Sequence, residues 1–138
     1  MANSVNTQII LDGPRNAIIK VEGILDTSDL ATTTIADPAD FMKMDSWGLN
    51  PPGGFLIQRI QYDVEPALEC RLAWDATTDV RIAELTGYGT QKYECFGGLP
   101  NNSGAGRTGK ILLSTQGWSA SAVLSFTLVL HLVKQGTV

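Results

Sequence analysis

The sequence predicts an all-β domain, and three observations lead to that fold class. Apolar and polar residues alternate with a period of two over several short segments, which is the spacing of a half-buried strand. Clusters of Gly, Pro, Asn and Asp separate these segments and are typical of turns. No window of helical length has an unbroken apolar stripe at i, i+3 and i+4. A chain of about seven to nine short strands favours a β-sandwich or barrel.

The N-terminal part contains one predicted strand and one predicted short helix. Residues 17–25 are rich in β-branched side chains and follow a turn-forming run at residues 12–16, so they predict a strand. Residues 38–44 predict a short helix, because Asp37 can cap it and Pro38 suits its first position. Residues 1–8 are small and polar, and we expect them to form an extended arm that orders only on contact with a partner.

The middle of the chain alternates more clearly. Between residues 55 and 64, four apolar residues fall on one face of a predicted strand, with Gln58 as the exception: Leu56, Ile60, Tyr62 and Val64. Residues 67–74 alternate without exception, and the apolar face holds Leu68, Cys70, Leu72 and Trp74. Residues 80–85 predict a shorter, less regular strand. Because Trp74 falls on an apolar face, we expect it to be buried.

The strongest pattern is near the C-terminus. One face of residues 122–133 holds Ala122, Leu124, Phe126, Leu128, Leu130 and Leu132. A strand this long is expected to run through the middle of a sheet. The 138 residues fit a single domain spanning residues 1–138. A jelly roll or another Greek-key sandwich is the expected arrangement, with the strand order left open.

Composition excludes several kinds of partner. The net charge is −4 and the pI about 4.8, and the ten basic residues are scattered singly, which argues against a nucleic-acid partner. There is no signal-like N-terminus and no apolar run long enough to span a bilayer, so we expect no membrane partner and synthesis in a reducing cytoplasm. In that reducing compartment Cys70 and Cys95 are expected to be free thiols.

One motif imitates a nucleotide site. Residues 104–110 satisfy the G-x-x-x-x-G-K part of a P-loop. However, the next residue is Ile111, where a hydroxyl that binds Mg²⁺ is needed, and the residues that follow predict a strand where the chemistry requires a helix. We therefore interpret the motif as a surface loop.

Other chemical groups are isolated. His131 is the only histidine, and it lies between two leucines without a second histidine at ligand spacing. Five aspartates fall between residues 26 and 45, but they lack the spacing of a calcium loop. We therefore predict no catalytic residue, no cofactor and no metal site, and expect that the chain is not an enzyme.

An apolar group in an irregular segment is the candidate partner-binding site. Phe41, Met42, Met44 and Trp47 lie just before the pair Pro51-Pro52. Such residues either fold back over the sandwich or dock on a partner. The sequence leaves both alternatives open.

The turn sequences carry a family resemblance. They include Asn3-Ser4-Val5-Asn6-Thr7-Gln8, Leu11-Asp12-Gly13-Pro14-Arg15-Asn16, Trp74-Asp75-Ala76-Thr77-Thr78, the run from Gly98 to Gly106, Thr108-Gly109-Lys110-Ile111 and Leu132-Val133-Lys134-Gln135-Gly136. Together they resemble small structural proteins of tailed bacteriophages, and among these the capsid decoration, or cement, proteins. The resemblance covers most of the chain and is weakest over residues 41–54.

The resemblance implies a non-enzymatic virion protein on the capsid exterior. Such a protein stabilises the capsid by bridging major capsid subunits, so its expected partners are the major capsid protein and further copies of itself, as a dimer or trimer. Two alternatives stay open. One is another virion component of the tail, baseplate or head completion. The other is a carbohydrate-binding β-sandwich that uses Trp47, Tyr88 and Trp118 as stacking platforms.

Overall fold

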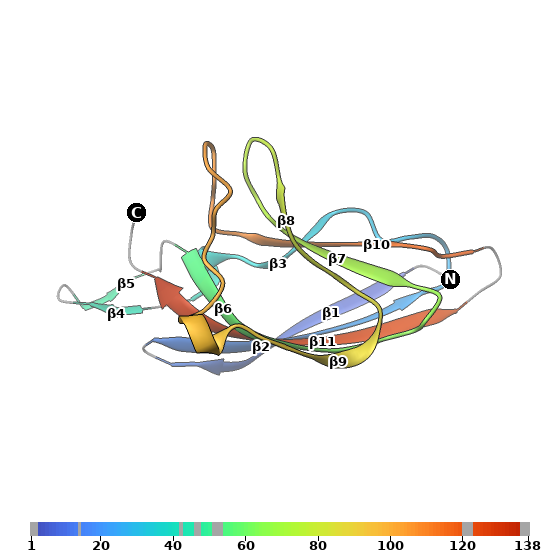
Figure 1. The fold of residues 1–138 in the computed structure, drawn as a ribbon, viewed down its shortest axis with the longest axis horizontal. Helices are drawn as coiled ribbons and strands as arrows, with labels where there is room; N and C mark the ends of the chain where they lie inside the picture. The colour runs from blue at the N-terminus through green and yellow to red at the C-terminus, as the bar shows by residue number, and fades with distance from the viewer. Residues whose placement is uncertain are drawn as a thin grey trace.

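The computed structural model describes residues 3–13, 15–41, 43–45, 48–50, 54–119 and 123–135. Two antiparallel sheets pack face to face (Figure 1), which confirms the predicted all-β sandwich. The five-stranded sheet has the order β1 (Ser4–Asp12), β2 (Asn16–Leu25), β11 (Leu124–Gln135), β6 (Gly54–Val64) and β9 (Gly87–Lys92). The four-stranded sheet has the order β3 (Thr33–Ala36), β10 (Ile111–Gln116), β7 (Glu69–Trp74) and β8 (Val80–Leu85). A small hairpin of β4 (Lys43–Asp45) and β5 (Gly48–Asn50) lies at one end.

Strand pairing is nested along the chain. β2 pairs with β11, β3 with β10, β6 with β9, and β7 with β8, so the main strands form one long hairpin rolled over itself. β1 adds to the outside of β2. β11 pairs with β2 on one side and β6 on the other. The C-terminal strand therefore runs through the centre of its sheet, as its sequence predicted.

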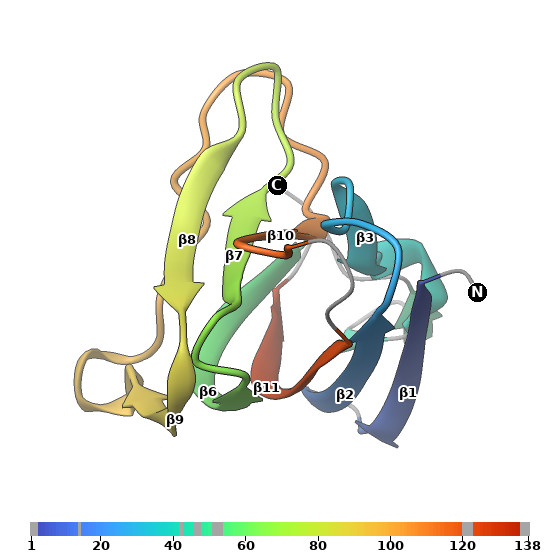
Figure 2. The same cartoon turned by 90° about the vertical axis from the view of Figure 1, so that its right-hand side faces the viewer.

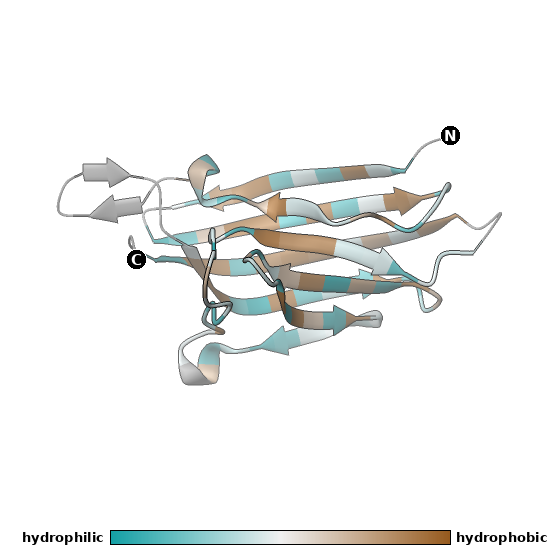
Figure 3. Ribbon diagram, turned by 90° about the horizontal axis from the view of Figure 1, so that it is seen from above, coloured by the Kyte–Doolittle hydropathy of each residue, from teal (hydrophilic) through white to brown (hydrophobic). Residues whose placement is uncertain are grey.

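The core lies between the two sheets and follows the predicted alternation. Trp74 is 1% exposed, and Leu68, Cys70 and Leu72 on the same face of its segment are also buried. The inward residues of β11 from Phe126 to Leu132 face them from the other sheet and are buried as well. Figure 3 shows the resulting change between apolar and polar residues along the strands. The burial of alternate residues accounts for most of the driving force for folding.

Gly23 permits one close contact in this core. It lies on the inward face of β2, opposite Phe126 of β11. A Cβ atom at this position would lie 2.3 Å from the Phe126 ring, far inside van der Waals contact. The phenyl ring therefore occupies the space that the side chain of any residue other than glycine would need at position 23.

The register predicted for residues 55–64 is correct only for the second half of β6. Ile60 and Val64 are buried, but Phe55 and Ile57 are buried in place of Leu56. The pairing with β11 jumps from Arg59 to Ile57, so Gln58 is an extra residue in a β-bulge. A bulge reverses the face on which the preceding residues lie. The polar exception at Gln58 was the sequence signal for this irregularity.

The helix predicted at residues 38–44 is only one turn long. Asp37 does cap it, because its Oδ1 accepts a hydrogen bond from the Ala39 amide at 3.0 Å, and the turn is a 3₁₀ helix at Pro38–Asp40. Phe41 then adopts an extended conformation and enters the core, and Lys43–Asp45 forms a strand. Burial of Phe41 therefore ends the helix earlier than predicted.

The N-terminal arm was also predicted incorrectly in one respect. Within residues 1–8, the part from Ser4 onward is extended, but it is paired with β2 rather than detached. Val5 faces Gly23 and Thr7 faces Val21 in this ladder. Backbone pairing needs no apolar side chain, so a polar segment can still complete the edge of a sheet.

Candidate functional site

The outer surface of the five-stranded sheet has no second layer over it in the described part of the chain. We call this surface the open face. Side chains on it alternate with the buried ones on each strand, and all of them are exposed or half-buried. Its residues include Lys20, Glu22, Gln61, Asp63, Thr127, Val129 and His131, with Thr90 on the edge strand β9. Such a broad surface suits contact with another macromolecule better than it suits a small ligand.

Charges on the open face form two rows across the strands. Arg59 and Lys92 lie side by side on β6 and β9 in one row, next to His131 on β11. In the second row Glu22 and Asp63 flank Thr127 of β11. Thr127 lies four residues before His131 on this strand, so the two rows are about 13 Å apart. The Arg59 guanidinium and the Glu94 carboxylate form an ion pair at 2.8 Å, and the Lys20 ammonium and Glu22 carboxylate form one at 2.6 Å. The face is therefore polar and patterned, without a large excess of one charge.

His131 lies on this face and not in a catalytic cluster. Its Nε2 lies 3.4 Å from Oε1 of Gln61. Partial burial and the nearby Arg59 charge hold the pKa of His131 below its ordinary value, so the ring is neutral near pH 7. Cys70 faces the core from the other sheet, and Cys95 is exposed. Both cysteines are free, as predicted. Among the described residues, no group of three or more His, Cys, Asp or Glu side chains could hold a metal ion.

Only one of the four apolar residues in the predicted partner site has a described side chain. Phe41 is 2% exposed and packs edge-on against Phe55, with ring centroids 5.2 Å apart. It therefore takes the first of the two alternatives and folds into the sandwich. Met42 and Trp47 lie outside the described residues, and Met44 is described only by its backbone in β4.

A different apolar group lies on β1, and sequence analysis did not select it. Ile9, Ile10 and Leu11 are 48%, 56% and 44% exposed. β1 is an edge strand, so no neighbouring strand covers its outer side in the described structure. Three consecutive aliphatic residues just before the turn at Asp12 were the available sequence signal. We call these three residues the β1 apolar group.

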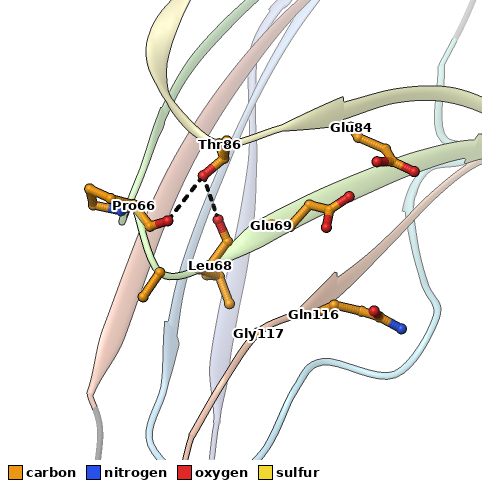
Figure 4. Close-up of a pocket in the computed structure, with 8 residues that line it drawn as sticks. Pro66, Leu68, Glu69, Glu84, Thr86, Gln116 and Gly117 are labelled. Atoms are coloured by element: carbon orange, nitrogen blue, oxygen red, sulfur yellow. Dashed lines mark hydrogen bonds between the residues drawn. The ribbon is translucent and has the colours of Figure 1, made fainter.

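The pocket in Figure 4 is formed by β7, β8 and the end of β10, with a volume of about 520 Å³. The carboxyl groups of Glu69 and Glu84 point toward each other in it. Side-chain hydrogen bonding with Glu69 and with Arg81 lowers the pKa of Glu84. A general acid that acts near pH 7 needs a raised pKa. The shift is in the opposite direction, and Arg71 also pairs with Glu69 at 3.3 Å. Glu84 therefore lacks the raised pKa that such an acid needs.

The P-loop lookalike is part of a braced surface projection. Residues 101–110 rise beside the loop that joins β7 to β8 (Figure 2). The Thr108 hydroxyl donates to Asp75 Oδ2 at 2.7 Å, and the Thr77 amide donates to the Ala105 carbonyl at 3.2 Å. Strand β10 follows the motif directly, as predicted, so no helix N-terminus faces the loop.

The aromatic residues considered for sugar stacking differ in exposure. Trp118 packs against the core and donates from Nε1 to the Leu25 carbonyl at 3.2 Å. Tyr88 is 85% exposed on β9. Trp47 lies outside the described residues. Of the two that the structure describes, Tyr88 is therefore the one available for stacking.

No helix of the described chain is long and apolar enough to cross a membrane. Comparisons with protein-family models, curated protein sequences and solved structures found no match.

Proposed function

We propose that this chain is a non-enzymatic structural protein of a phage particle that decorates the capsid exterior and bridges major capsid subunits. The turn sequences that resemble those of decoration proteins support this role. The nested pairing of β2 with β11, β3 with β10, β6 with β9 and β7 with β8 supports the further inference that the sandwich is a jelly roll. Jelly rolls recur in viral capsid proteins and in lectins, an analogy at the level of fold.

The open face is the observation that carries the proposal. It is the outer surface of a whole sheet, and it mixes aliphatic, polar and charged side chains. Interfaces between proteins have this composition, with exposed charges around less polar residues. Val129 lies half-buried at its centre on β11. A broad surface of this kind is suited to lie against the junction between capsid subunits.

A pair of matched variants tests this assignment. Val129→Lys places a charge in the centre of the open face, and Ser114→Lys places one on the outer face of the other sheet, also on a central, half-buried strand position. Each variant is incubated with undecorated shells of the encoding phage, and attachment is measured by co-sedimentation. We expect Val129→Lys to weaken attachment at least tenfold and Ser114→Lys to leave it unchanged. Equal attachment of both variants would show that another surface binds.

One observation favours a second candidate, carbohydrate binding. Tyr88 presents its ring to solvent and lies on the open face beside Asp63. Aromatic rings next to carboxylates are suited to stack on and hydrogen-bond a sugar. A glycan array distinguishes the two functions, because binding that is lost in Tyr88→Ala would support the lectin role.

A further inference from the structure

The two sheets have four edges, and β1 is the one whose first part, from Ser4 to Ile9, lacks a feature that prevents pairing. Natural edge strands are protected by charges, short length, irregular backbone or bulges. β3 has only four residues, and β8 carries Arg81 and Glu84. β9 contains Gly87 and Gly89 at positive φ and ends in Lys92. From Ser4 to Leu11, β1 has no charged residue and no proline.

The sequence of β1 is complementary to itself in one register. In an antiparallel pair, directly opposed residues must lie on the same face of the sheet. A two-fold axis at Thr7 satisfies this rule and opposes Thr7 to its own copy. It also opposes Val5 to Ile9 of the second copy and Asn6 to Gln8 of the second copy. Apolar residues therefore meet on one face and amides meet on the other.

Electrostatics and exposure favour the same arrangement. Asp12 is the only charged residue of β1, and it lies five residues from the proposed axis. The two Asp12 carboxylates would be about 34 Å apart, well beyond the screening length of about 8 Å at physiological salt. The pairing would also cover part of Ile9, which is 48% exposed in the single chain. The bulge at Ile10 would end the paired segment.

We propose that β1 pairs antiparallel with β1 of a second copy across a two-fold axis at Thr7. The two five-stranded sheets then become one continuous sheet, and both open faces lie on the same side. The inference deepens the proposed function, because a dimer with two coplanar open faces can attach to two neighbouring sites on a symmetric shell.

Cross-linking at the axis tests the register. Thr7→Cys is made in a Cys95→Ser background, because Cys95 is exposed while Cys70 is buried. The control, Thr90→Cys in the same background, places an exposed thiol on β9 at the opposite edge of the sheet. A short bis-maleimide at low protein concentration should join the Thr7→Cys variant into a dimer and leave the control monomeric. Equal cross-linking of both variants, or of neither, would overturn the proposal.

Oligomeric state gives an independent test. The wild-type chain of 14.8 kDa should sediment as a dimer, and Thr7→Lys should weaken dimerisation at least tenfold because it opposes two ammonium groups. Thr90→Lys should remain dimeric. Melting curves of both lysine variants show whether unfolding causes a loss of dimer. If Thr7→Lys does not fold, the cross-linking experiment still tests the proposal. A monomeric wild type that still attaches to shells would overturn the dimer and leave the proposed function intact.

Discussion

The buried side chain of Lys134 in the last strand forms an ion pair with Asp12 of the first strand. The Lys134 side chain is fully buried, and its ammonium contacts the Asp12 carboxylate and also donates to the Gly13 carbonyl at 2.5 Å. The ammonium also lies 5.7 Å from the centroid of the Phe41 ring. This contact fixes the end of β1 to the central strand of its sheet.

The pair predicts unequal effects of removing its two members. Asp12→Ala leaves a buried ammonium without its carboxylate, and we expect a loss of about 1–3 kcal/mol, moderated because Asp12 is partly exposed. Lys134→Met keeps most of the buried volume and leaves Asp12 to the solvent, so its loss should be smaller. Urea denaturation of both variants measures the difference. A larger loss for Lys134→Met would contradict this explanation.

Trp74 should be essential for stability. Truncation of a buried aromatic residue to Ala costs about 3–5 kcal/mol, which is a large fraction of the stability of a small domain. Trp74→Ala should therefore unfold or aggregate the protein. The control Tyr88→Ala removes an aromatic residue that is 85% exposed, and its melting temperature should be nearly unchanged. A soluble Trp74→Ala variant with a normal melting temperature would contradict the core described above.

Gly23 and Phe126 should show strong energetic coupling. Gly23→Ala brings a Cβ into the space of the Phe126 ring, and we expect a loss of about 1–3 kcal/mol from overpacking. In a Phe126→Leu background the same substitution should cost much less, because the ring is absent. A double-mutant cycle measures this coupling. Additive losses would show that the ring can move aside.

The two cysteines should differ in reactivity. Burial raises the pKa of the Cys70 thiol from its ordinary value of 9.0 to about 12, so this thiol stays protonated, whereas Cys95 is exposed. In the native protein, Ellman's reagent should modify Cys95 alone. The folded state also holds the Cys70 proton more tightly than the unfolded state between pH 9 and about pH 12. Stability should therefore fall as pH rises through this range, and Cys70→Ala should reduce that slope.

The P-loop lookalike should bind no nucleotide. A strand follows Lys110, and Ile111 lacks the hydroxyl that Mg²⁺ requires. Calorimetry with ATP and Mg²⁺ should show no binding by the wild type or by Lys110→Ala. Micromolar binding that Lys110→Ala abolishes would disprove the loop interpretation.

Local sequence patterns predicted much of the fold. The alternation around Trp74 and along β11 indicated which face is buried, because a strand places every second residue on the same side. The bulge at Gln58 was less predictable, since it depends on how β6 pairs with β11. The pairing of residues 4–8 with β2 was missed for a related reason. Edge pairing uses backbone groups, which leave little trace in side-chain composition.

The candidate surfaces were harder to predict than the core. The sequence around Phe41 was compatible with a buried or an exposed side chain. The packing of Phe41 against Phe55 in the folded chain decides in favour of burial. The β1 apolar group became visible as a surface when the sheet order placed β1 at an edge. Which partner covers a surface depends on a second molecule, and one chain's sequence does not specify that molecule.

Electron cryo-microscopy of shells before and after incubation with the purified chain tests the central claim most directly. The account predicts added density on the capsid exterior, over junctions between major capsid subunits, into which the sandwich fits with its open face toward the shell. Shells without added density at saturating protein, or density confined to the tail, would contradict the proposed role in capsid decoration.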